Sequence, residues 1–256
     1  MDVQKTSAKR VGKIRFLPGL TVKGGLTRHP FDLEYGVRTS GLVAGRHLKS
    51  GHSHDRHATA YYGVAPSVFH GLITRWRRTR PIAPIEGFTL IDIGAGMGRA
   101  MLLASVLPFR AVLGIELNPK LLRIARSNLA EWRKGGHALN PMRLSGGDAT
   151  SFRFPSGPCL AFFFNPFGAP VMKRFIRHVA FTFAERPGQL DLLYINNEQE
   201  SVLEMQSGLQ RMFLGPVRRS RADARADREI MSRQPDGEYT SEDHEDCSIW
   251  RWTGNS

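Results

Sequence analysis

One short stretch, residues 92–98, constrains the fold of this chain more than any other feature. It reads Asp-Ile-Gly-Ala-Gly-Met-Gly, and it lies between an apolar run at residues 89–93 and a helical pattern at residues 99–107. Glycines at such a junction let backbone N–H groups approach a ligand closely, because no Cβ stands in the way. The stretch therefore predicts a strand, a ligand-binding turn and a helix in direct succession.

The alternation of apolar runs and helical patterns continues along the chain. Further strands are expected at residues 111–116, 142–144, 160–164 and 190–195, and helices at residues 119–132 and 171–183. Asn118 suits the N-cap of the first of these helices, and Pro119 suits its first position. Strands that alternate with helices form a parallel sheet that is covered on both faces.

The two ends of the chain depart from this alternation. A helix is expected after Pro66, where apolar residues recur at three- and four-residue spacing. Residues 216–246 are charged and irregular, and residues 247–252 alternate like a last edge strand. The predicted fold class is therefore α/β: a Rossmann-like, doubly wound, mostly parallel seven-stranded sheet with helices on both faces and an antiparallel C-terminal edge strand.

The length of 256 residues is enough for one large α/β domain. We divide the chain into a basic N-terminal tail and cap segment, residues 1–60, and a catalytic unit, residues 61–256. No apolar run approaches the roughly 18 residues that span a bilayer, and no secretory signal is recognisable. Two cysteines cannot form a disulfide framework, which favours reduced thiols inside the cell. From these features together we expect a cytoplasmic protein with no membrane partner.

Positive charge is concentrated in a few places along the chain. There are 36 Lys and Arg residues against 23 Asp and Glu residues, which gives a formal net charge of +13. Basic clusters lie within residues 1–28, 75–80 and 218–221, and such clusters attract nucleic acid or other anions. No recognised basic-aromatic module accompanies them, so nucleic-acid binding stays an open alternative.

The polar segment at residues 51–57 holds three histidines: His52, His54 and His57. Histidine is a common metal ligand, but a metal site needs further ligands at a regular spacing. Neither a cysteine nor a regular histidine spacing accompanies this segment. We therefore expect a solvated loop and no metal.

The spacing of the glycines narrows the choice of ligand. Gly94, Gly96 and Gly98 form G-x-G-x-G, whereas dinucleotide-binding turns read G-x-G-x-x-G. Arg99 stands where the third dinucleotide glycine belongs, which argues against a pyrophosphate ligand. No Gly-Lys-Ser/Thr follows, which excludes a Walker phosphate loop.

Three acidic residues stand at the positions that would surround an adenosine. Glu116 ends the second strand, where a carboxylate can accept hydrogen bonds from both ribose hydroxyls. Asp148 follows the third strand and can accept from an adenine amino group, and Asp92 can orient the turn or meet an ammonium group. These acids and the glycine turn occur in the order that an adenosine site requires.

This combination resembles the class I S-adenosylmethionine (SAM) dependent methyltransferases, over residues 88–168. The resemblance extends to a broad bacterial group of methyltransferases of uncharacterised activity, which carry a segment like residues 31–41 and an Asn-Pro-Phe-Gly motif. It is more distant to the Rossmann-fold histone-lysine methyltransferases. In both groups an aromatic segment ahead of the first strand folds over the cofactor, and Tyr61 and Tyr62 stand there in this chain.

The resemblance implies SAM as the cofactor and assigns the residues that would bind it. These are Tyr62, Asp92, Gly94, Ala95, Gly96, Gly98, Glu116, Leu117, Asp148, Ala149 and Asn165.

The segment after the fourth strand, Asn165-Pro166-Phe167-Gly168, resembles the Asp/Asn-Pro-Pro-Tyr/Phe signature of amino-methylating enzymes. In that signature the side-chain carbonyl and the following main-chain carbonyl accept hydrogens from the target nitrogen. We therefore expect Asn165, Pro166 and Phe167 to be the catalytic residues. Phe167 replaces the second proline of the signature, so specificity for nucleic acid or glutamine does not carry over.

The predicted function is SAM-dependent transfer of a methyl group to an amine nitrogen of a protein or a small molecule. One alternative is an RNA or DNA methyltransferase, which the net charge of +13 would favour. Another is a non-catalytic SAM-binding protein, which would have no open cleft beside Asn165. The acceptor and the oligomeric state stay open at this point.

Overall fold

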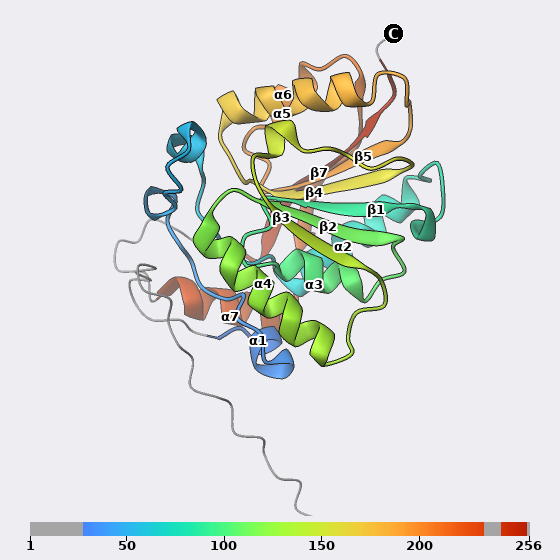
Figure 1. Cartoon of the computed structure of the whole chain (residues 1–256). Coiled ribbons are helices and arrows are strands. Elements are labelled where there is room, and N and C mark those ends of the chain that lie inside the picture. The colour runs from blue at the N-terminus through green and yellow to red at the C-terminus, as the bar shows by residue number, and fades with distance from the viewer. Residues whose placement is uncertain (1–27, 233–241, 255–256) are drawn as a thin grey trace, which may run out of the picture.

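A mixed seven-stranded sheet with helices on both faces forms the core of the protein in the computed structural model, which describes residues 28–232 and 242–254 (Figure 1). The strands are β1 (Thr89–Ile93), β2 (Ala111–Glu116), β3 (Met142–Gly146), β4 (Cys159–Phe164), β5 (Leu190–Ile195), β6 (Leu209–Arg218) and β7 (His244–Trp252). They lie in the order β3-β2-β1-β4-β5-β7-β6, and β1 to β5 are parallel. This arrangement confirms the predicted fold class.

The helices divide between the two faces of the sheet. They are α1 (Pro30–Tyr35), α2 (Pro66–Arg78), α3 (Arg99–Ser105), α4 (Pro119–Lys134), α5 (Ala169–Thr182), α6 (Glu200–Glu204) and α7 (Arg221–Ser232). Helices α2, α3 and α4 pack on one face through one hydrophobic cluster, and α5 and α6 pack on the other through a second (Figure 1). The central strands are buried on both faces, which is why they read as mostly apolar runs without a regular polar alternation.

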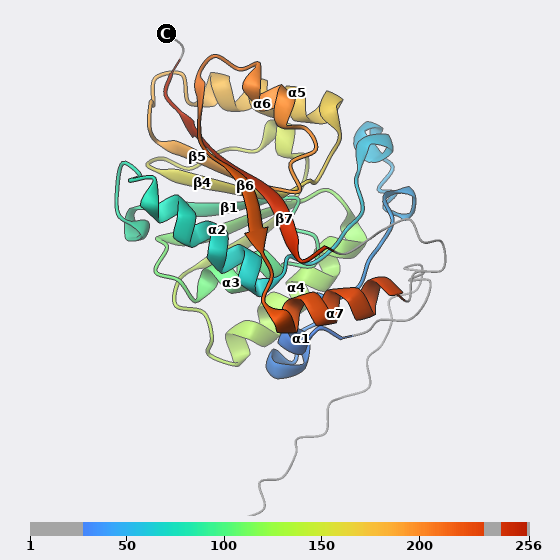
Figure 2. The same cartoon turned by 180° about the vertical axis from the view of Figure 1, so that it is seen from behind.

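The sequence predicted that the C-terminal strand would be the edge strand of the sheet, and this position is wrong. Strand β7 pairs antiparallel with β5 on one side and with β6 on the other, so β6 is the edge strand (Figure 2). Residues 216–246, interpreted as irregular, include the end of β6 and the whole of α7. The buried face of α7 carries Asp223 and Asp227 among alanines, and this polar content hides the helical period from a hydrophobicity pattern.

The cap segment packs on the outside of α3 and α4 and does not stand apart from the core. The ring of Phe31 in α1 stacks on Trp132 of α4, with 5.7 Å between the ring centroids. Tyr35 contacts the same indole at 4.9 Å. The segment after α1 then runs over the carboxyl ends of the strands, where Val43 and Tyr61 form an isolated antiparallel bridge. Residues far from the core in sequence therefore cover the edge at which α/β folds bind ligands.

Among the residues that the structure describes, no helix combines the length and the apolar character needed to cross a membrane.

Candidate functional site

The glycine turn connects β1 to α3 with its backbone in the left-handed region. The φ angles are 73° at Gly94, 55° at Gly96 and 89° at Gly98, a conformation that glycine adopts without strain. A Cβ on Gly96 would collide with the ring of Tyr61, the residue that follows the cap segment. The turn thus requires glycine for two reasons, its backbone geometry and the close approach of Tyr61.

Glu116 ends β2 directly beside this turn, because β1 and β2 are parallel neighbours. Its carboxylate accepts hydrogen bonds from the backbone N–H of Gly96 and of Asn118, each at 2.7 Å. Burial raises the pKa of Glu116, although these backbone donors act in the opposite direction. Each oxygen has one donor on the protein side, and the remaining lone pairs can accept from a ligand.

Asp92 is a second buried carboxylate at the same place. It is 4% exposed, and burial together with the nearby charge of Glu116 raises its pKa to about 8. Neither carboxylate has an ion-pair partner among the described residues. Two buried acids without a cation give this site a strong preference for positive charge.

Asp148 follows β3 and is partly buried. It accepts from the backbone N–H and the hydroxyl of Thr150, at 2.9 and 2.8 Å. The Nδ1 atom of His54 lies 3.2 Å from its carboxylate, and His52 approaches to 4.0 Å. Burial alone would raise the pKa of Asp148, but the Thr150 donors and the two histidines hold it below its usual value.

The histidine segment therefore contacts the site, a contact that its sequence did not reveal. The ligand atoms of His52, His54 and Asp148 lie within 4.8 Å of one another, close enough to surround a metal ion. However, Nε2 of His54 lies 2.9 Å from a guanidinium nitrogen of Arg174, which can only donate. Nδ1 of His54 must then carry the proton, so it can donate to Asp148 but has no lone pair for a metal.

One cavity, here called the first cavity, collects these groups at the carboxyl edge of the parallel strands. Of the residues expected to bind a cofactor, those that line it are Tyr62, Asp92, Gly94, Ala95, Gly96, Glu116, Leu117, Asp148 and Ala149, together with Pro166 and Phe167. Gly98 does not line the first cavity: it is the N-cap of α3 and lies against Ala125 and Leu129 of α4. Asn165 lines a neighbouring cavity instead.

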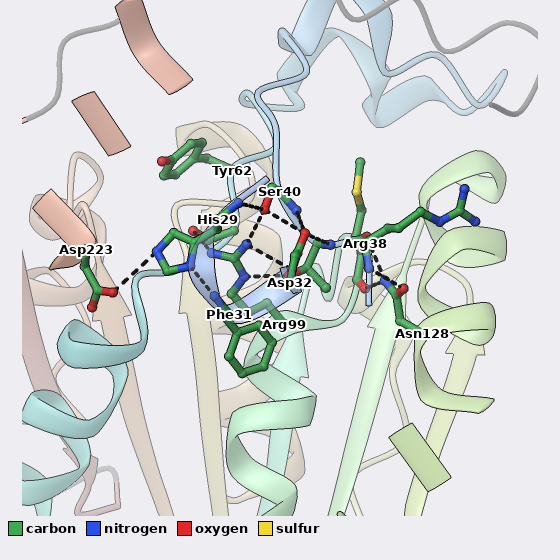
Figure 3. Close-up of polar contacts among 12 residues, drawn as sticks. His29, Phe31, Asp32, Arg38, Ser40, Tyr62, Arg99, Asn128 and Asp223 are labelled. Atoms are coloured by element: carbon green, nitrogen blue, oxygen red, sulfur yellow. Dashed lines mark hydrogen bonds and ion pairs between the residues drawn. The ribbon is translucent and has the colours of Figure 1, made fainter. Parts of the chain in front are cut away.

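Arg99, Tyr61 and His54 also line the first cavity, and the sequence had placed only Tyr61 near a cofactor. The guanidinium of Arg99 is buried and lies 3.4 Å from the carboxylate of Asp32 in α1. Its Nε donates to the Thr39 hydroxyl at 2.6 Å, and a terminal nitrogen donates to the Ser40 hydroxyl at 3.0 Å (Figure 3). The residue that argued against a dinucleotide thus anchors the cap to the first turn of α3.

Asn128 of α4 strengthens this connection. Its side-chain amide donates to the carbonyls of Arg38 and Met97, at 2.8 and 2.9 Å, and it accepts from the Arg38 N–H at 2.9 Å (Figure 3). One side chain therefore joins the cap to the glycine turn. The positions of the cap and of the turn depend on each other.

Asn165 is 5% exposed and lies at the end of β4 with a positive φ of 36°. The Thr59 hydroxyl donates to its main-chain carbonyl. The Tyr194 hydroxyl donates to its Oδ1 at 3.2 Å, so the carbonyl expected to contact the target nitrogen already has one partner. Phe167 packs against Phe175 in the core, with 5.9 Å between ring centroids, and faces the first cavity.

No family model matches this sequence, and a comparison with curated proteins finds no relative. Among solved structures, the cyclase SpnF is 18% identical with a TM-score of 0.50, over 73% of this chain and 81% of that one. The YcgJ protein from Bacillus subtilis is 15% identical with a TM-score of 0.44, over 73% and 99% of the two chains. A provisionally assigned RNA methyltransferase from Pyrococcus horikoshii is 14% identical with a TM-score of 0.45, over 72% and 84%. The likeness to SpnF shows a shared fold.

Proposed function

We propose that this protein is a SAM-dependent methyltransferase and that the first cavity binds SAM. The observation that supports this most is the shared location of the glycine turn and two buried carboxylates without a cation, Asp92 and Glu116. Arg99 is the arginine that lines this cavity, and its charge is committed to Asp32. The site therefore favours a nucleoside that carries positive charge.

The residues of the cavity fit the parts of SAM. Glu116 would hold the two ribose hydroxyls, Asp148 the adenine amino group and Asp92 the ammonium group. A pyrophosphate would instead meet no free cation among the described residues here, because the charge of Arg99 is committed to Asp32. Asp92 thus fits the ammonium group of SAM, whereas Glu116 could hold a ribose in either ligand.

When bound, SAM supplies a methyl group that its sulfonium already activates. The protein then has to align an acceptor nitrogen with that methyl group and to exclude water. Tyr61 closes over Gly96, and Tyr62 and Phe164 line both cavities. Asn165 would position the acceptor nitrogen from the second cavity; the Thr59 hydroxyl holds its main-chain carbonyl and the Tyr194 hydroxyl contacts its side chain. The acceptor we favour is an amine of a protein or a small molecule.

Two other outcomes are distinguishable. Methylation of RNA or DNA is favoured by the net charge of +13. A non-catalytic SAM-binding protein would lack an open cleft beside Asn165, but Asn165 does line a cavity. We also propose that the protein belongs to the bacterial group with the Asn-Pro-Phe-Gly motif, on the basis of residues 165–168.

The direct test is transfer of a labelled methyl group from SAM to a fractionated lysate, with and without nuclease or protease. We expect a labelled product that survives nuclease. Loss of the label after nuclease treatment would show that the methyl acceptor is a nucleic acid and not an amine of a protein or a small molecule. No transfer to any fraction, despite SAM binding, would support the non-catalytic alternative.

A further inference from the structure

A second cavity of about 490 Å³ opens beside the first, at the carboxyl ends of β4 and β5. The two cavities share Thr59, Ala60, Tyr62 and Phe164, so a molecule in the second would lie next to one in the first. The second cavity is lined by Leu42, Thr59, Ala60, Tyr62, Phe164, Asn165, Asn196, Glu198, Arg219, Met231, Glu242, His244, Glu245 and Asp246. Its size lies in the range of cavities that bind small molecules.

The lining of the second cavity is acidic, although the protein as a whole is basic. Four carboxylates, those of Glu198, Glu242, Glu245 and Asp246, face one arginine, Arg219. With histidine neutral, the formal charge of the lining is 1 − 4 = −3, whereas that of the chain is +13. Charge of this sign attracts cations and repels a phosphate backbone.

Arg219 has no nitrogen free for an anionic ligand. Its Nε lies 2.8 Å from the buried carboxylate of Asp227, and a terminal nitrogen pairs with Glu245. The other terminal nitrogen donates to the main-chain carbonyls of Glu242 and His244, the latter at 2.8 Å. Asp227 in turn accepts from the hydroxyl of Tyr62. The positive charge in this wall is therefore neutralised within the protein.

The carboxylates that line the second cavity still outnumber the positive charges beside them. Burial is the main reason that the pKa of Glu245 is raised to about 7; Arg219 opposes this rise, and the nearby carboxylates of Asp227, Asp246 and Glu242 add to it. Glu242 and Asp246 are largely exposed and share His244 as a neighbour, at 3.3 and 3.9 Å. A bound cation would relieve this repulsion.

Asn165 gives an independent indication of a polar ligand. It is buried, it lines the second cavity, and no described residue accepts from its Nδ2. The Tyr194 hydroxyl has a lone pair as well as a proton, so a 180° turn of the amide keeps the contact with Tyr194. That turn would present Oδ1 to an N–H group in the cavity.

We infer that the second cavity binds the methyl acceptor, and that the acceptor is a small amine with at least one further positive charge. Glu198, Glu242 and Asp246 would hold the charged end, and Asn165 would contact the reacting nitrogen. This inference rests on the proposed function of the first cavity. The acidic wall makes RNA and DNA poor occupants of this cavity.

The reaction that follows is balanced without a further reactant. The reacting ammonium first loses a proton to solvent, which leaves a neutral amine. The nitrogen lone pair then forms the bond to the methyl carbon, while the carbon–sulfur bond breaks and its electron pair stays on sulfur. The products are a methylated ammonium and a neutral thioether.

The test uses 1,4-diaminobutane as a doubly charged probe and n-butylamine as its singly charged control. Binding is measured by calorimetry on the full chain saturated with S-adenosylhomocysteine. We expect the diamine to bind more tightly than the monoamine. The double variant Glu198→Gln, Asp246→Asn should weaken diamine binding about tenfold, because two exposed ion pairs are lost. Glu86→Gln, an exposed acid outside both cavities, is the control that should change nothing.

SAM affinity, measured on the same proteins without S-adenosylhomocysteine, separates the two proposals. Failure of wild-type protein to bind SAM would contradict the proposed function itself. Unchanged SAM affinity with weakened diamine binding in the double variant would support the inference. Equal binding of diamine and monoamine, or diamine binding that the double variant leaves unchanged, would overturn it. Methylation of an RNA fraction that increases in the double variant would also overturn it, since the acids would then only repel the true acceptor.

Discussion

The two cavities lie side by side, but the chain builds them in different ways. The acids of the first leave the ends of neighbouring strands, β1, β2 and β3, within about sixty residues of sequence. The second takes its walls from seven separated regions, from Leu42 to Asp246. The first cavity can therefore be recognised as a motif in the sequence. The second forms only when the C-terminal residues pack beside the ends of β4 and β5.

The two sets of acids also differ in burial. Asp92 and Glu116 are 4% and 7% exposed, whereas Glu242 and Asp246 in the second cavity are 68% and 70% exposed. Water screens exposed charges and leaves buried ones nearly unscreened. Substitutions in the first cavity should therefore have larger effects than those in the second.

The largest effect should come from the anchor of the cap, because the cap lines both cavities. Arg99→Ala would leave the Asp32 carboxylate buried without its cation. We expect the free energy of unfolding to fall by about 3–5 kcal/mol, measured by urea denaturation. Arg77→Ala, an exposed arginine of α2, is the matched control. A loss of under 1 kcal/mol would show that the cap is held by other contacts.

The next effect concerns the pH dependence of stability. The pKa of Asp92 is about 8 in the folded protein, above the usual value of 3.8, so the folded state retains a proton that the unfolded state loses. Between about pH 4 and 8, Asp92 should therefore lower stability as pH rises, by at most about 1.4 kcal/mol per pH unit. Asp92→Asn should flatten this slope in urea titrations at several pH values. An identical slope in the variant would contradict the unpaired state of Asp92.

A smaller effect is expected at the adenine end of the first cavity. Asp148 is more exposed than Glu116 and would contribute one hydrogen bond to the ligand. Asp148→Asn should weaken SAM binding about fivefold in calorimetry, with Glu131→Gln on the exposed side of α4 as control. A loss of SAM affinity as large as that caused by Glu116→Ala would contradict the placement of adenine at Asp148 and of the ribose at Glu116.

The smallest effect belongs to the second cavity. Glu245 gains its charge as pH rises through about 7, while aliphatic amines stay protonated. Diamine affinity should therefore rise by up to about fivefold between pH 6 and pH 8, and Glu245→Gln should remove this rise. Affinity that falls over the same range in wild-type protein would contradict the role given to the carboxylates.

The contrast between the cavities also explains what sequence could predict. The glycine turn, Glu116 and Asp148 were identified because strand ends and their order are local features. The contact of His54 with Asp148 joins residues about ninety positions apart, and no spacing signals it. The pairing of Tyr62 with Asp227 spans 165 positions. Asp227 lies in α7, and the polar residues on the buried face of this helix hid its helical pattern in the sequence.

The central claim is that Glu116 holds a SAM molecule in the first cavity. Calorimetric titration of SAM into wild-type protein and into Glu116→Ala tests it most directly, with Glu131→Ala as control. We predict saturable binding to one site in the wild type and about 100-fold weaker binding to Glu116→Ala, since two hydrogen bonds to a buried charge are lost. Unchanged affinity in Glu116→Ala, or the absence of SAM binding to the wild type, would contradict the assignment of this cavity.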